Sequence, residues 1–189
     1  ALSADVIMRL LEEAGVPAGV INLVHGSGRQ IAQTAIAHPD FAGVNFTGST
    51  EVFRSLWKQI AANIDDYRSF PRMVGETGGK NAVIAHPTAD ADAVRTALIR
   101  SSYEYQGQKC SASSRAYIAR GVWDQIKDEL IDTVRDLPVG DVASHETYVG
   151  AVIDEVALNR LQSAFDRANE LDSHELLVGG KTHPEKGWF

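Results

Sequence analysis

The sequence contains a single cysteine, Cys110, among its 189 residues. One cysteine excludes a disulfide bond within the chain, and so little cysteine suits a reducing compartment, where thiols stay reduced. Any thiol chemistry by these residues therefore depends on Cys110.

Basic residues are also scarce: the sequence has 18 Lys and Arg against 25 Asp and Glu, which gives a net charge of -7. The basic residues are scattered among acidic ones and form no stripe, which argues against a nucleic-acid-binding surface. No apolar run approaches the length that crosses a membrane, and residues 1–20 carry acids where a secretion signal has a basic start and an apolar core. We therefore expect no nucleic-acid partner, no membrane partner and no targeting segment in this chain.

Helical and strand patterns alternate along the chain, which at 44% hydrophobic and 23% charged residues has a globular composition. The predicted helices are 5–14, 29–37, 50–64, 90–103, 122–137 and 154–171. The predicted strands are 20–24, 43–47, 72–74, 81–85, 115–119 and 175–178. This alternation predicts an α/β fold built from βαβ units with a largely parallel sheet.

Cys110 lies in the polar segment GQKCSA (107–112). A cysteine attacks as its thiolate, which a nearby positive charge stabilises, and Lys109 supplies such a charge. The alternative is an inert, buried cysteine, which acts as a small hydrophobic side chain. Because the neighbours are Lys, Gln and Ser instead of apolar residues, the segment favours a nucleophile.

Glu76 is a candidate base, isolated in the glycine-rich segment GETGGKN (75–81). It follows the apolar pair at 73–74, so it lies at the end of a predicted strand, where the clefts of α/β proteins open. A solvated loop carboxylate is the alternative interpretation of the same position.

Two glycine-bearing turns follow predicted strands and precede predicted helices, at HGSG (25–28) and FTGSTE (46–51). Such turns direct backbone N–H groups and the positive helix end toward a phosphate. Gly26 in the first turn is a weak candidate, because the turn lacks the full dinucleotide fingerprint. In the second, Gly48 and Ser49 are candidates for phosphate binding, although Ser49 alone is also a normal N-cap.

Three segments resemble, in order and spacing, the cofactor turn, the general-base motif and the nucleophile motif of the aldehyde dehydrogenase family: 46–49, 75–81 and 107–112. The resemblance runs along essentially the whole chain. It implies an NAD cofactor, a small-molecule aldehyde substrate and no metal. A cysteine of this motif would form a thiohemiacetal and then a thioester with the substrate.

The same resemblance implies roles for individual residues. Cys110 would be the nucleophile and Glu76 the base that activates water for hydrolysis of the thioester. Gly48, Ser49 and, less specifically, the turn at Gly26 would contact the cofactor. Ser111 and Lys109 would meet a carboxylate of the substrate.

Further segments are similar to one branch of the family, which oxidises L-glutamate γ-semialdehyde, formed from Δ1-pyrroline-5-carboxylate, to L-glutamate in proline breakdown. These segments are LWKQI (56–60), FPR (70–72), RSSYEY (100–105) and VGD (139–141). Phe53 also stands where many other aldehyde dehydrogenases have glycine.

Members of this family are far longer, so the resemblance implies an internal fragment. Residues 1–76 would be the later half of a Rossmann-like NAD-binding domain, and residues 77–189 the N-terminal part of a catalytic domain. The fragment alone is expected to be inactive. The full-length protein would be a homo-oligomer of the bacterial cytoplasm or the mitochondrial matrix.

Two alternatives remain open at this point. The first is a non-catalytic fragment or module that keeps the motifs but lacks half of each site. The second is an aldehyde dehydrogenase of another specificity, including an acylating enzyme that passes the thioester to coenzyme A. Glu76 argues against the acylating enzyme, because hydrolysis needs a base.

Overall fold

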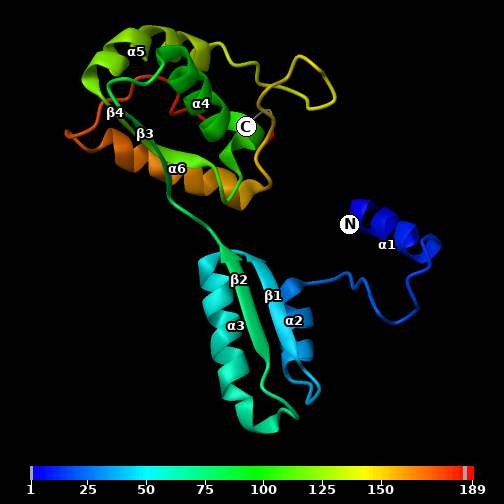
Figure 1. Cartoon of the computed structure of the whole chain (residues 1–189). Helices are drawn as coiled ribbons and strands as arrows, with labels where there is room; N and C mark the ends of the chain where they lie inside the picture. The colour runs from blue at the N-terminus through cyan, green and yellow to red at the C-terminus, as the bar shows by residue number, and fades with distance from the viewer. Residues whose placement is uncertain (1, 185–186) are drawn as a thin grey trace. The chain divides into compact units, whose positions relative to one another are not determined.

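The computed structural model describes residues 2–184 and 187–189, which form two compact units (Figure 1). The first unit ends at Gly78 and the second begins at Gly79, so the chain passes between them inside the 75–81 motif. Residues 1, 185 and 186, which the predicted domain ranges include, lie outside the described residues. Within that described part, no helix is long and apolar enough to cross a membrane.

The first unit contains a parallel two-stranded ladder, β1–β2. Its core consists of Ile36, Leu56 and Ile60, with the inner faces of both strands packed against it. Leu56 and Ile60 are four residues apart and therefore lie on one helix face. The elements are α1 (Leu2–Glu13), α2 (Gly28–Ile36), β1 (Gly43–Gly48), α3 (Thr50–Ala62), a 3₁₀ turn (Ile64–Asp66) and β2 (Arg72–Thr77).

The second unit repeats this arrangement around a second parallel ladder, β3–β4. Its core is formed by Ala85, Val94, Leu98, Val122 and Ile126. The carboxylates of two aspartates cap its helices, at the N-termini of α4 and α6. The elements are β3 (Asn81–Ala85), α4 (Ala91–Tyr103), a 3₁₀ turn (Glu104–Gly107), β4 (Ser113–Ile118), α5 (Arg120–Arg135) and α6 (Glu155–Asn169).

All six predicted helices form, with ends shifted by a few residues, and the predicted α/β fold class is confirmed. Two predicted strands are wrong, because residues 20–24 and 175–178 form no ladder with any described residue. A strand needs a neighbour to take its N–H and C=O groups. Val20 and Val24 are instead 68% and 64% exposed.

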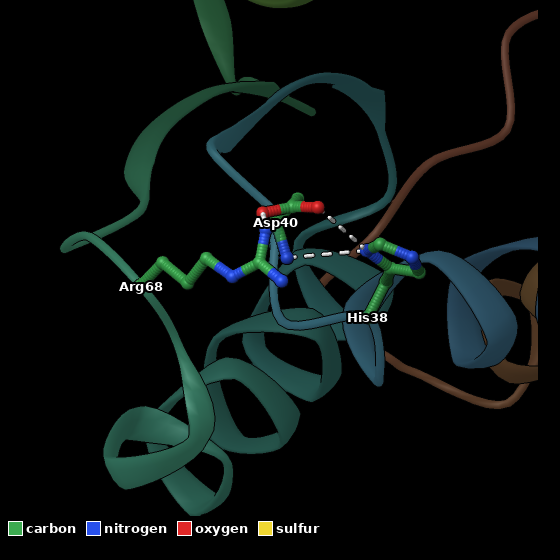
Figure 2. A network of polar contacts seen from close by, with 3 residues as sticks. All are labelled: His38, Asp40 and Arg68. Carbon is green, nitrogen blue, oxygen red and sulfur yellow. Dashed lines mark hydrogen bonds and ion pairs between the residues drawn. The ribbon is translucent and has the colours of Figure 1, made fainter.

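A polar network joins the two loops that precede β1 and β2 (Figure 2). The Asp40 carboxylate lies between the Arg68 guanidinium and the His38 ring, with 2.5 Å between Arg68 Nη1 and Asp40 Oδ1. The Asp40 N–H donates to His38 Nδ1 at 3.1 Å. Tyr67 also donates its hydroxyl to the Ile36 carbonyl at 2.8 Å. The network therefore fastens the amino ends of the strands, opposite the end that carries Glu76.

Gly75 in β2 lies directly beneath the ring of Phe53 in α3. A Cβ added at Gly75 would meet ring atoms of Phe53 at 2.4 Å and 2.6 Å. That ring also stacks on Phe46, at 6.0 Å between centroids, and meets Trp57 edge-on at 5.8 Å. Position 75 therefore has no room for a side chain while Phe53 keeps its place.

We predict that Gly75→Ala destabilises the first unit by about 1–3 kcal/mol, because the methyl group overpacks the aromatic cluster. Thermal or chemical denaturation measures this change. Gly78→Ala is the matched control, since a Cβ there meets nothing within 4 Å. In a Phe53→Ala background, Gly75→Ala should lower the free energy of unfolding by much less. An equal loss of stability in both backgrounds would show that the methyl group does not clash with Phe53.

Candidate active site

The carboxyl ends of β1 and β2 bring together three of the predicted site residues. In the parallel register, Thr47 lies opposite Glu76, and Gly48 lies opposite Thr77. Glu76 is solvent-exposed, and Ser49 follows Gly48 directly. Glu76 and the glycine turn at 48–49 therefore occupy the sheet edge at which α/β proteins bind their ligands.

Ser49 is the N-cap of α3, and its hydroxyl oxygen accepts from the Val52 N–H at 3.2 Å. The predicted cap is thus confirmed, whereas the contact with phosphate stays a prediction. The N–H groups of Thr50 and Glu51 belong to the first helical turn, which has no carbonyl partners within the helix. These groups could bind an anion at the positive end of α3.

A cleft of about 760 Å³ lies between α2 and α3. Apolar atoms and alkyl stems line most of it, with Arg29 and Glu51 among its polar residues. Its lining is Gly28, Arg29, Ala32, Gln33, Glu51, Val52, Ser55, Leu56 and Gln59. Glu51 and Val52 of the lining belong to the first turn of α3, which Ser49 caps, so the cleft lies near the candidate anion site. The third predicted cofactor residue, Gly26, lies in the exposed turn that leads into α2.

Cys110 lies at the corner of a β-turn between α4 and β4. The Ala112 N–H donates to the Lys109 carbonyl at 3.0 Å, which places Cys110 and Ser111 at the two central positions. Both central residues are exposed, and the Cys110 thiol is free. A turn corner presents a side chain to solvent, so the alternative interpretation of Cys110 as a buried side chain is wrong.

The backbone before this turn is left-handed at two residues that are not glycine. Tyr105 has φ 55° and Gln106 has φ 57°, and Gly107 follows at φ 66°. Such conformations cost free energy and persist where other contacts impose them. Gln108 supplies one such contact, because its Oε1 accepts from the Ile153 N–H at 2.9 Å.

Lys109 is next to Cys110 in sequence, but its ammonium group is bound to Glu104. Lys109 Nζ donates to Glu104 Oε2 at 2.6 Å, and Arg100 lies 3.6 Å from the other carboxylate oxygen. The hydrogen bond and the charge of Lys109, and then the charge of Arg100, lower the pKa of Glu104 from 4.5. The sequence predicts that the Lys109 charge stabilises the Cys110 thiolate, but the structure shows that this charge also interacts with the Glu104 carboxylate.

We predict that Glu104→Gln destabilises the protein slightly at pH 7 and has no effect in acid. Because the folded-state pKa is lowered, Glu104 stabilises the fold above its unfolded pKa of 4.5, and this contribution disappears as the pH falls through the folded value. Melting temperatures of parent and variant between pH 7 and pH 3 measure the change. Glu146→Gln, an exposed loop carboxylate, is the control; a constant difference at all pH values would contradict the prediction.

The predicted residues thus fall into two groups, one in each unit. Gly48, Ser49 and Glu76 lie together in the first unit, and the turn at 109–111 holds the others except Gly26. Sequence reasoning missed Glu104 and Asn81, which both contact the turn from outside it. It also missed the α2–α3 cleft, because the lining residues come from two helices and form no continuous motif. Among the described residues, no three His, Cys, Asp or Glu side chains are placed to hold a metal ion.

The chain belongs to the aldehyde dehydrogenase family, whose model matches residues 1–189. It is 42% identical over 190 residues to the mitochondrial Δ1-pyrroline-5-carboxylate dehydrogenase of Dictyostelium discoideum, covering all of this chain and 34% of the relative. The predicted family is therefore confirmed.

Solved structures agree with this assignment. The Δ-pyrroline-5-carboxylate dehydrogenase from Mycobacterium tuberculosis, bound with NAD, matches with a TM-score of 0.95 and 47% identity over 100% of this chain and 35% of that one. Succinate-semialdehyde dehydrogenase from Burkholderia pseudomallei matches with a TM-score of 0.85 and 32% identity over 97% of this chain and 37% of that one. The chain spans about a third of the length of these relatives.

Proposed function

We propose that the protein carrying these residues oxidises L-glutamate γ-semialdehyde, formed from Δ1-pyrroline-5-carboxylate, to L-glutamate with NAD. The observation that carries this proposal is the 47% identity, at a TM-score of 0.95, to a Δ-pyrroline-5-carboxylate dehydrogenase bound with NAD. The exposed thiol of Cys110 and the exposed carboxylate of Glu76 at a strand end supply the reacting groups that this chemistry needs.

The reaction begins when the Cys110 thiolate attacks the aldehyde carbon and forms a thiohemiacetal. NAD, when bound, accepts the hydride that leaves this carbon, and the product on Cys110 is a thioester. Glu76 then removes a proton from a water molecule that attacks the thioester carbonyl. The carbon–sulfur bond breaks, which releases the carboxylate product and returns the Cys110 thiolate.

The first unit offers a place for the cofactor. The pyrophosphate would lie at the N-terminus of α3, on the turn at Gly48 and Ser49, where the amides of the first turn face an anion. The α2–α3 cleft, at about 760 Å³, has the size and apolar lining to take the adenosine part. The turn at Gly26 would close the cofactor site before α2.

The substrate would approach the turn that carries Cys110. Ser111 is exposed beside the thiol, and its hydroxyl can donate to the carboxylate of the semialdehyde. Lys109 would attract the same carboxylate, although its ammonium is shared with Glu104. Ser111 is therefore the stronger of the two candidates for this contact.

A steady-state assay of the full-length protein tests the proposed function. Oxidation of L-glutamate γ-semialdehyde should exceed that of succinate semialdehyde by about tenfold or more in kcat/KM. The reverse order would favour the second candidate, a specificity like that of the succinate-semialdehyde enzyme, which matches at 32% identity. No oxidation of either aldehyde would favour a non-catalytic module.

We further propose that the 189-residue chain alone is inactive, because it spans about a third of the length of its relatives. The full-length protein would act as a homo-oligomer in the bacterial cytoplasm or the mitochondrial matrix, and the Dictyostelium relative is a mitochondrial enzyme. Size-exclusion chromatography with light scattering measures the oligomeric state.

A further inference from the structure

One side chain reaches from β3 to the turn that carries Cys110. The amide nitrogen Nδ2 of Asn81 donates to the Cys110 carbonyl at 2.7 Å and to the Ala112 carbonyl at 3.2 Å. An asparagine amide has two N–H donors, so the two carbonyls use both of them. No other hydrogen bond from a side chain to the Cys110 carbonyl occurs in the described residues.

The carbonyl that Asn81 holds belongs to the central peptide of the Lys109–Ala112 turn. The two commonest β-turns, types I and II, differ by a flip of this central peptide. A peptide unit is planar, so fixing the Cys110 carbonyl also fixes the direction of the Ser111 N–H. Asn81 therefore holds the turn in one of its two forms.

A β-bulge lies next to Asn81 in the β3–β4 ladder. In the β3–β4 ladder Asn81 lies opposite Ser113 but Ala82 lies opposite Arg115, which leaves Ser114 as an extra residue. Bulges of this kind re-aim side chains and are frequent beside active sites. Gly79 approaches from the same segment, and a Cβ there would lie 3.2 Å from the Cys110 carbonyl oxygen.

We infer that Asn81 is a positioning residue for Cys110, which it places by holding the central peptide of the turn. This inference rests on the proposed function, in which Cys110 is the nucleophile. Asn81 does not touch the reacting atoms; it acts through the backbone of the residue that does.

The test compares Asn81→Ala and Asn81→Asp with the parent in the full-length protein. Aspartate keeps the shape of asparagine but replaces the two donors by acceptors, which repel the two carbonyls. Both variants should lower kcat for L-glutamate γ-semialdehyde by about 10- to 100-fold, because a misplacement of about 1 Å costs about 100-fold. The Kd for NAD, measured by calorimetry, should stay within about twofold, since the candidate cofactor turn lies in the other unit.

Ser114→Ala is the matched control. The Ser114 hydroxyl donates to the backbone carbonyl of Asn81 at 3.4 Å, so this variant removes a neighbouring bond and leaves the Asn81 amide in place. Its kcat should stay within about twofold of the parent. Asn81 variants with less than a fivefold loss would overturn the inference, and so would an aspartate variant that matches the parent, because shape alone would then suffice.

Two further measurements keep the test decisive. If the Asn81 variants do not fold, Gly79→Ala perturbs the same carbonyl from another side, and an unchanged kcat there overturns the inference. The rate of alkylation of Cys110 by iodoacetamide is measured for every variant. Should Cys110→Ala retain activity, the proposed function fails, and an altered alkylation rate in the Asn81 variants still decides whether Asn81 places the thiol.

Discussion

Cys110→Ala in the full-length protein should abolish aldehyde oxidation, with a loss of about 10,000-fold or more in kcat. In the proposed reaction the thiol forms the covalent bond on which both later steps depend, and removal of a nucleophile costs about as much as removal of the whole catalytic group. The single-turnover burst of NADH should vanish with it. Stopped-flow absorbance at the NADH wavelength measures both quantities.

Chemical modification gives independent support for the same assignment. Cys110 is exposed at a turn corner, so iodoacetamide should alkylate it rapidly, and NAD or substrate should change the rate. Peptide mass spectrometry locates the adduct. Ser114→Ala is again the control for effects on folding. A Cys110→Ala variant that oxidises the aldehyde at the parent rate would refute the nucleophile.

Glu76→Gln should lower steady-state turnover by about 100- to 10,000-fold, the range that a positioned base contributes. The amide cannot take a proton from water, so the thioester on Cys110 should accumulate. Formation of the thiohemiacetal and loss of the hydride need no proton acceptor at position 76. A burst of about one NADH for each site should therefore survive in the variant.

Glu13→Gln is the control for this experiment, because Glu13 is an exposed glutamate of the same unit at the end of α1. Intact mass of the denatured protein after one turnover should show the acyl adduct on the Glu76 variant alone. Turnover equal to that of the parent would exclude Glu76 as the base. Loss of the burst as well would place Glu76 in an earlier step.

The helices and the α/β fold class were predictable because their signals are local. Leu56 and Ile60, or Val122 and Ile126, repeat at helical spacing, and both pairs are buried in the two cores. Ser49 before an acidic first turn predicts the cap that the structure contains. Each of these signals depends on residues within one or two turns of chain.

The contacts around Cys110 depend on residues far apart in sequence or on unusual backbone conformations, and they were not predictable. Asn81 and the Cys110 carbonyl are 29 residues apart. Lys109 meets Glu104 because the backbone between them turns left-handed at Tyr105 and Gln106, which neither residue type signals. The prediction of strands at 20–24 and 175–178 was wrong for a related reason. An apolar run shows that a segment is hydrophobic, but it does not show whether a neighbouring strand is present to pair with it.

The left-handed backbone before Cys110 has a consequence for the timing of synthesis. Each left-handed residue that is not glycine costs about 1–2 kcal/mol, so the segment depends on later contacts. One of these joins Gln108 to Ile153, 45 residues further along the chain. At about 5–20 residues per second, Ile153 is added about 2–9 seconds after Gln108. During this interval on the ribosome, the thiol is already present in the nascent chain but the bond between Gln108 and Ile153 cannot yet form, so the segment before Cys110 gains this support only after the chain has grown well past the cysteine.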